Sequence, residues 1–211
     1  MHTGLITDWA SRNGISITDA QLNLLAKHQE KVLETNKYMN LTAITCPQEF
    51  AVKHIIDSMA LLPYIPCGIK LADIGTGAGF PGIVLAIMRP DLRVTLIDSL
   101  RKRIFFLQEI IHELGLENVQ AVHSRAEDNR LGMAFDICTA RAVAPMDKLA
   151  RWVLPITAPG GTFLAMKGPD VTQELENAKP AVAKQGGLVE AVDMVEIAPG
   201  MMRSIVVISR K

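Results

Sequence analysis

The sequence of 211 residues has few cysteines, few aromatic residues and no net charge. Its three cysteines, Cys46, Cys67 and Cys138, are too far apart to suggest a disulfide framework or a pair of zinc ligands. Lysine plus arginine and aspartate plus glutamate each number 22, so only a local basic patch could mark a nucleic-acid binder. No uncharged run reaches the ~20 residues that span a bilayer, and the first residues do not resemble a secretory signal. We therefore expect a cytoplasmic protein without a membrane anchor.

Apolar residues, in contrast, make up 49% of the chain and charged residues 21%. This proportion supplies a large core and excludes extensive disorder. The length suits one sizeable domain with an appendage.

The first part of the chain has helical patterns only. Thr18 and Gln21 form a capping box, which predicts a helix that runs to about Tyr38. A second helix is expected from Pro47, because proline is tolerated in a first helical turn. Its apolar stripe consists of Phe50, Ile55, Met59 and Leu62. We interpret residues 1–65 as a helical cap, which ends where prolines and a glycine interrupt the pattern.

From residue 66 to residue 211, short apolar runs alternate with helical patterns, which is typical of an α/β domain with a mostly parallel sheet. The last two runs flank a proline–glycine turn and predict an antiparallel hairpin at one edge. Seven strands are expected at 71–74, 93–97, 119–122, 135–139, 162–166, 188–197 and 204–208, the third to fifth of them buried, with helices at 81–88, 101–114 and 146–154.

A glycine-rich segment from Asp73 to Gly82 lies where the first strand turns into a helix. Gly75, Gly77 and Gly79 allow positive φ angles and a close approach of the backbone to a ligand. A tight turn alone is the structural alternative, but a turn does not require three alternating glycines.

Two cofactors suit such a loop. A nicotinamide dinucleotide would place its pyrophosphate on the helix N-terminus, whereas S-adenosylmethionine has no phosphate and carries a sulfonium and an amino-acid end. Asp73 favours S-adenosylmethionine, because a carboxylate repels a pyrophosphate and attracts a cationic methionyl group. The pattern G-x-G-x-x-G, which residues 77, 79 and 82 satisfy, does not discriminate between the two.

Further candidate site residues follow the next strands. Asp98 ends the second strand, where a carboxylate can accept hydrogen bonds from both ribose hydroxyls. Alternatively, Asp98 caps the helix that opens at Arg101, a role that Ser99 could also fill. Ala126 and Glu127 follow the third strand, at the edge where ligands bind in such sheets.

The order of these motifs resembles the ribosomal RNA small subunit methyltransferase G family, whose older name is glucose-inhibited division protein B. The resemblance covers nearly the whole chain from Thr18, with departures at Thr35, where a tryptophan is usual, and at Ala78, where a proline is frequent. It rests on Asn40–Thr42, His54, Asp57–Ser58, 73–83, 98–103, 125–127, 140–142, Lys167–Gly168, Arg203 and 206–208.

This resemblance implies a Rossmann-like class I methyltransferase that methylates N7 of one guanine in 16S rRNA, called 527 in the family's nomenclature. It implies S-adenosylmethionine as the cofactor and 16S rRNA or the small ribosomal subunit as the partner. The family's cofactor contacts fall on Gly75, Phe80, Asp98, Ser99, Leu100, Ala126, Glu127 and Arg141, to which the loop adds Asp73, Gly77 and Gly79.

Guanine N7 carries an exposed lone pair, so its methylation needs orientation and exclusion of water but no general base. We expect Arg141, Lys167 and His54 to orient the guanine or the RNA, and the alternative for Lys167 is an ordinary surface lysine. The cluster of His54, Asp57 and Ser58 could instead be solvated or cap a helix. A basic run could bind the RNA backbone or could be the exposed side of a helix, and it consists of Arg89, Arg93, Arg101, Lys102 and Arg103. The expected RNA contacts are Asn40, His54, Asp57, Ser58, Arg101, Lys102, Arg103, Lys167 and Arg203.

Other functions stay open at this point. A methyltransferase acting on a different RNA or on a small molecule would use the same scaffold. An NAD-dependent oxidoreductase would use a similar glycine loop, and a non-catalytic regulator could bind the cofactor without turnover. We expect a monomer.

Overall fold

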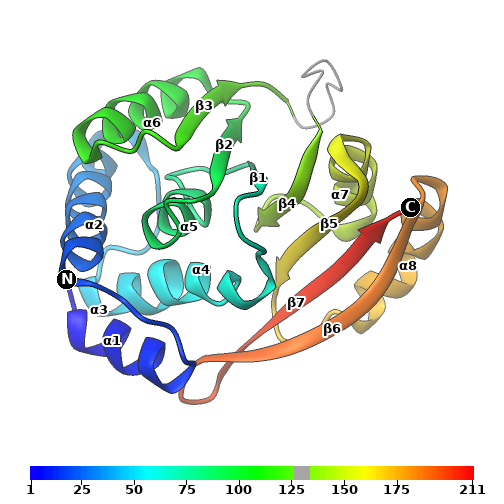
Figure 1. The fold of residues 1–211 in the computed structure, drawn as a ribbon, viewed down its shortest axis with the longest axis horizontal. Coiled ribbons are helices and arrows are strands. Elements are labelled where there is room, and N and C mark those ends of the chain that lie inside the picture. The colour runs from blue at the N-terminus through cyan, green and yellow to red at the C-terminus, as the bar shows by residue number, and fades with distance from the viewer. Residues whose placement is uncertain (126–133) are drawn as a thin grey trace.

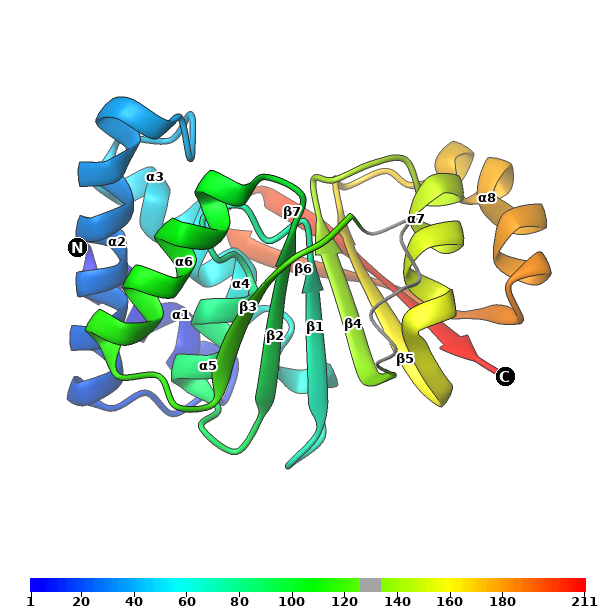
Figure 2. The ribbon, with the colours of Figure 1, turned by 90° about the horizontal axis from the view of Figure 1, so that it is seen from above.

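The computed structural model describes residues 1–125 and 134–211, which form a seven-stranded sheet with helices on both faces (Figures 1 and 2). The strand order is β3-β2-β1-β4-β5-β7-β6. All neighbouring pairs are parallel except those of β7, which is antiparallel to both β5 and β6. The predicted α/β sheet with an antiparallel hairpin is thereby confirmed. The strands are β1 Lys70–Ile74, β2 Arg93–Asp98, β3 Val119–His123, β4 Phe135–Arg141, β5 Thr157–Lys167, β6 Gly187–Ala198 and β7 Met201–Arg210.

The helices divide into two layers. Those before β3 cover one face of the sheet, and those after β4 cover the other (Figure 2). Within the described ranges no helix is both long and apolar enough to cross a membrane. The helices are α1 Thr3–Arg12, α2 Asp19–Met39, α3 Pro47–Phe50, the π-helix η1 Ala51–Ile56, α4 Asp57–Met59, the 3-10 helix η2 Leu62–Tyr64, α5 Gly82–Met88, α6 Arg101–Leu114, α7 Met146–Val153, the 3-10 helix η4 Leu154–Ile156 and α8 Thr172–Lys184.

The N-terminal helices share one apolar core with the sheet. Leu25 of α2 and Phe50 of α3 are completely buried in the same cluster as Leu71 of β1 and Leu164 of β5. The predicted capping box is present, since Gln21 N donates to Thr18 Oγ1 over 3.2 Å and Thr18 N donates to Gln21 Oε1 over 2.9 Å. The start of α2 is therefore fixed by its own sequence.

Four details differ from the sequence-based expectation. Helices α1 and α8 were not expected, and the helix expected from Pro47 is divided into α3, η1, α4 and η2. Strand β3 is not buried as expected, because it forms one edge of the sheet and its residues are half-buried or exposed. The loop expected between the last two strands shrinks to Pro199–Gly200, because Ala198 already pairs with Met201. These differences come from tertiary packing, which overrides local patterns.

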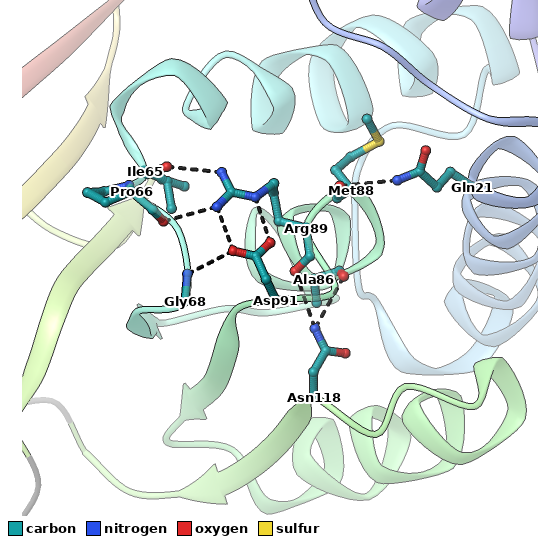
Figure 3. A network of polar contacts seen from close by, with 9 residues as sticks. All are labelled: Gln21, Ile65, Pro66, Gly68, Ala86, Met88, Arg89, Asp91 and Asn118. Carbon is teal, nitrogen blue, oxygen red and sulfur yellow. Dashed lines mark hydrogen bonds and ion pairs between the residues drawn. The ribbon is translucent and has the colours of Figure 1, made fainter.

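Arg89 and Asp91 tie the amino end of β2 to the linker before β1 (Figure 3). The Arg89 guanidinium donates two bonds of 2.7 Å to the Asp91 carboxylate and others to the carbonyl groups of Ile65 and Pro66. Asp91 accepts a further bond from Gly68 N, and the arginine holds the pKa of Asp91 well below its usual range. Arg89 thus belongs to a structural network at the amino end of β2. Arg101–Arg103, the other part of the basic run, lie beyond the opposite end of this strand.

Candidate active site

The glycine loop connects β1 to α5 at the carboxyl edge of the sheet. Gly75 has a φ of +67°, and a Cβ there would lie 2.5 Å from Val143 Cγ2. Gly79 has a φ of +93°, and its Cβ would lie 2.4 Å from Ile83 Cδ1. Both the backbone conformation and the lack of space therefore require glycine at these positions.

Asp73 is fully buried beneath this loop. Its Oδ2 accepts hydrogen bonds from Thr76 Oγ1 over 2.6 Å and from Gly82 N over 2.8 Å. Its Oδ1 has no hydrogen-bond partner among the described residues. Burial raises the pKa of Asp73 to about 6, against the effect of these two bonds and of Arg141. The carboxylate therefore fixes the loop and keeps one oxygen unpaired.

Most backbone N–H groups of the loop are already used within the protein. Gly75 N and Thr76 N donate to Ile97 O, and Gly79 N and Phe80 N donate to Thr76 O. Gly77 N donates to Asp98 Oδ2 over 3.0 Å. A pyrophosphate needs several free N–H donors at such a loop, so this loop is poorly suited to a dinucleotide.

A cavity of about 380 Å³, here called the glycine-loop cavity, opens beside the loop at the ends of β1 and β2. Its residues combine apolar walls with a carboxylate and hydroxyl groups, a combination that suits a nucleoside. They are Ile74, Gly75, Ile97, Asp98, Ser99, Ser124, Arg125, Val143 and Trp152.

Asp98 lines this cavity and binds the backbone on both sides of it. It is 3% exposed, and its Oδ1 accepts a bond from Leu100 N over 2.9 Å while its Oδ2 also contacts Arg103 Nη1 at 3.3 Å. No side chain of the described residues caps α6, whose N-cap is Leu100. Neither Asp98 nor Ser99 therefore fills the alternative capping role. Ala126 and Glu127, expected at the same edge, lie outside the described residues.

A second cavity, here called the arginine cavity, also has a volume of about 380 Å³ and lies beside the end of β4. Val143 lines the glycine-loop cavity, whereas Arg141 and Ala142 line the arginine cavity, so residues 141–143 run between the two. Ala142 has a positive φ of 55°, a strained conformation for alanine. The lining residues are Ile44, Lys53, His54, Asp57, Arg141, Ala142, Met166, Lys167, Gly168 and Arg203.

Asp57 joins two arginines of this cavity. Its Oδ2 accepts a bond of 2.8 Å from Arg141 Nη1, and its Oδ1 accepts one of 3.1 Å from Arg203 Nε. Arg141 Nη1 also donates to the Lys53 carbonyl over 2.9 Å. Because Asp57 is only 3% exposed, both pairs are largely shielded from water and held in one geometry.

His54 fixes the other side of the Arg141 guanidinium. Arg141 Nη2 lies 3.1 Å from His54 Nδ1, and His54 Nε2 lies 2.8 Å from Thr42 Oγ1. Since arginine only donates, Nδ1 must be the acceptor and Nε2 must carry the proton. Burial and the Arg141 charge lower the pKa of His54 to about 3. The imidazole is therefore neutral, and both of its nitrogens are engaged.

The ring of Phe80 lies within this cluster. His54 stacks on it with 4.5 Å between ring centroids, and His28 stacks on it with 4.8 Å. Burial also lowers the pKa of His28, to about 4. Phe80 is 4% exposed, so its side chain mainly joins α2 and η1 to the glycine loop. Nothing in the sequence spacing pointed to His28.

The other expected site residues lie at several places. Lys167 donates to the Ala144 carbonyl and to Glu174 Oε1 over 2.6 Å, and Ser58 is buried with its hydroxyl donating to the His54 carbonyl. Asn40 ends α2 with a φ of 53° and is exposed. The structure thus brings His54, Asp57, Arg141, Lys167 and Arg203 together, but not Asn40 and Arg101–Arg103. Sequence reasoning missed Thr76 and Glu174, which the glycine loop and Lys167 use as partners.

A third cavity, of about 620 Å³, lies along α2 between Gln29, Leu33 and Pro47. It is larger than the other two but shares no lining residue with either of them. Of the predicted site residues, Gly75, Asp98 and Ser99 line the glycine-loop cavity, and His54, Asp57, Arg141, Lys167 and Arg203 line the arginine cavity. The carboxyl edge of the sheet, where these two cavities lie, is therefore the candidate active site.

Comparison with known proteins finds similarity to a family of methyltransferases. The family model described as rRNA small subunit methyltransferase G matches residues 21–205. The chain is 45% identical over 177 residues to "Ribosomal RNA small subunit methyltransferase G" of Desulforamulus reducens, a match covering 81% of this chain and 74% of the relative. It is 42% identical to the protein of that name from Pelotomaculum thermopropionicum, covering 97% and 89%.

Solved structures share the fold at lower identity. The crystal structure of TrmN from Thermus thermophilus is 20% identical with a TM-score of 0.58, over 73% of this chain but only 48% of that chain. The ribosomal protein L11 methylase from Lactobacillus delbrueckii subsp. bulgaricus is 14% identical with a TM-score of 0.58, over 74% and 77%. These similarities indicate the class I methyltransferase fold.

Proposed function

Because the chain belongs to the rRNA small subunit methyltransferase G family, we propose that it methylates N7 of one guanine in 16S rRNA with S-adenosylmethionine. The guanine is the one called 527 in the family's nomenclature. The observation that carries this proposal is the pair of adjacent cavities at the carboxyl edge, one shaped for a nucleoside and one lined by cationic side chains. We further propose that the protein acts as a monomer in the cytoplasm, with residues 66–211 as the catalytic domain and residues 1–65 as its cap.

The glycine-loop cavity and the loop beside it fit S-adenosylmethionine. Gly75, Gly77 and Gly79 leave room for the methionyl part, while Asp98, Ser99 and Leu100 lie where the ribose would bind. Asp73 has one unpaired carboxylate oxygen to attract the cationic end. We expect any contact of Phe80 with the cofactor to come from its main-chain carbonyl, since its ring is covered and its N–H donates to Thr76 O. When bound, the cofactor supplies an electrophilic methyl group.

The arginine cavity supplies orientation for the acceptor base. Guanine N7 is already unprotonated, so no side chain has to remove a proton from it. The neutral His54 agrees with this, because both its nitrogens are engaged with protein partners. Arg141 keeps donors beyond its bonds to Lys53, His54 and Asp57, and these can bind the base, a phosphate or the cofactor carboxylate.

Recognition of RNA by this chain should depend only weakly on bulk charge. The formal net charge is zero, so few counterions are released when naked RNA binds. We expect a shallow dependence of the dissociation constant on salt concentration, and we expect the assembled small subunit to contribute to selectivity. Filter binding to a short 16S rRNA fragment across a salt series measures this, and tight binding with a steep slope would contradict it.

Mapping of N7-methylguanine in 16S rRNA tests the function directly. RNA from cells that lack the gene should be unmethylated at this guanine and should gain the mark when purified protein and S-adenosylmethionine are added. Unchanged RNA, or a mark at another base, would refute the proposal.

Ligand binding separates the alternatives. S-adenosylhomocysteine should raise the melting temperature, whereas NAD should not. Asp73→Asn should lose this shift and Lys167→Ala should keep it. Cofactor binding without methyl transfer to any rRNA would favour a regulator instead.

A further inference from the structure

Two exposed aromatic side chains lie at the same edge of the sheet as both cavities. Tyr38 is 73% exposed and Phe105 is 63% exposed, more than any other large hydrophobic residue in the described ranges. Tyr38 lies at the end of α2, and Phe105 lies near the start of α6. Figure 2 shows the end of α2 and the start of α6 on the side to which β1 and β2 point.

Cations accompany both rings. Arg101 and Lys102 precede Phe105 by four and three residues on α6, so all three share one side of the helix. Both cations are exposed, and no ion pair joins either of them to a carboxylate of the described chain. Lys37 is the neighbour of Tyr38 and is likewise unpaired within those ranges.

Carboxylates near these cations are few or already engaged. Glu109 and Glu113, farther along α6, both pair with Lys31, at 2.7 and 2.8 Å. Asp98 accepts bonds from its own backbone and from Arg103. Glu34, one turn before Tyr38, is the nearest acidic residue on α2. The start of α6 therefore presents cations and an aromatic ring to the solvent without a neutralising charge.

This combination fits a polyanion that also offers flat apolar groups. A nucleic-acid duplex hides the faces of its bases, so an exposed ring can stack only on an unpaired base. We propose that Phe105 and Tyr38 stack on unpaired nucleobases of the RNA near the methylated guanine, while Arg101 and Lys102 contact its phosphates. This inference rests on the proposed function, because it takes RNA as the substrate.

The test compares single-stranded with double-stranded RNA. A short single-stranded RNA and the same strand annealed to its complement are titrated with Phe105→Ala, Tyr38→Ala, Phe105→Trp and the control Met194→Ala, an exposed apolar residue on β6 that is 48% exposed. Each alanine variant should weaken single-strand binding on the order of 10-fold. Phe105→Trp should restore it, because tryptophan also stacks, and Met194→Ala should have no effect.

Methylation kinetics with unmodified small ribosomal subunits supply the second measurement. The alanine variants should raise KM for the subunit with unchanged kcat and unchanged affinity for S-adenosylhomocysteine. Equal losses for single strands and duplexes would overturn the stacking role. A loss for the subunit but not for naked RNA would indicate a protein partner and would also overturn it. Failure of the wild-type chain to methylate any rRNA would instead refute the proposed function.

Discussion

Asp57 determines how the arginine cavity is arranged. One buried carboxylate holds Arg141 from β4 and Arg203 from β7, whose positions in the sequence are far apart. Arginine side chains lose much rotamer freedom when they are fixed in this way, so a fixed pair is ready to bind without further ordering. Asp57 is therefore a positioning residue, which acts on the substrate through the two guanidinium groups.

Asp57→Asn removes the charge but keeps the size of the side chain. We expect kcat to fall about 10- to 100-fold, in line with the ~1.5–3 kcal/mol of a hydrogen bond to a charged group, while the affinity for S-adenosylhomocysteine changes little. Single-turnover methylation and calorimetry measure the two quantities. Asp170→Asn, at an exposed carboxylate, is the control. Equal losses of kcat and cofactor affinity would show that Asp57 is merely structural.

Asp73 predicts a pH dependence of cofactor binding. Burial raises its pKa to about 6, and a cationic ligand favours the ionised form. Affinity for S-adenosylhomocysteine should therefore fall as the pH drops through about 6, and Asp73→Asn should bind weakly with no such dependence. Adenosine lacks the amino-acid end and serves as the control ligand. A pH dependence that persists in Asp73→Asn would assign it to another group.

At the scale of elements, the first turn of α2 does two things at once. Gln21 completes the capping box with Thr18 through its Oε1, and its Nε2 donates to the carbonyl group of Ile87. The same Nε2 donates to the carbonyl group of Met88 at the end of α5 (Figure 3). The Gln21 side chain therefore caps α2 and also connects α2 to α5, the helix that follows the glycine loop.

Substitutions at these two positions should separate the two roles. Thr18→Ala should lower the free energy of unfolding by about 1 kcal/mol, the usual cost of a lost N-cap. Gln21→Glu keeps the cap acceptor but offers no donor to α5, so it should destabilise the protein while Thr18 still caps. Urea denaturation measures both variants. If Gln21→Glu is as stable as the wild type, the contact with α5 contributes nothing.

Elements with local signals were predictable from the sequence. α2 begins at its capping box, and α6 ends at Gly115, which adopts a φ of +63°. α1 and α8 carry weaker signals, because α8 contains Pro180 and buries only Ala178, Ala181 and Val182. The glycine loop and the position of Asp98 at the end of β2 could also be predicted from the sequence. The stacking of His28 on Phe80 could not be predicted, because it depends on packing between elements that are distant in the sequence.

For the whole molecule, buried titratable groups determine how the free energy of unfolding depends on pH. His28 and His54 have pKa values lowered to about 4 and about 3, so near pH 5 the unfolded chain binds about two protons that the folded chain does not. Asp73, with its raised pKa, is protonated in the folded chain and largely ionised in the unfolded chain at the same pH. It offsets one of the two protons.

The net difference of one proton predicts that stability falls as the pH is lowered. The free energy of unfolding should decrease by on the order of 1 kcal/mol per pH unit between pH 6 and 5. Urea denaturation at both values checks this. His28→Gln should flatten the dependence, whereas the exposed His112→Gln should not change it. Constant stability of the wild type would show that the two histidines are not neutral in the folded state.

The position of β7 has a consequence for the synthesis of the protein. This strand is made last among the seven, yet it inserts between β5 and β6, and Trp9 of α1 donates to the Glu196 carbonyl of β6 over 2.9 Å. A chain still emerging from the ribosome therefore cannot close its sheet, and the indole of its first helix lacks its partner until β6 is made. Such intermediates leave the edge of β5 unpaired until β7 is made, so we expect nascent chains to be prone to aggregation during that interval.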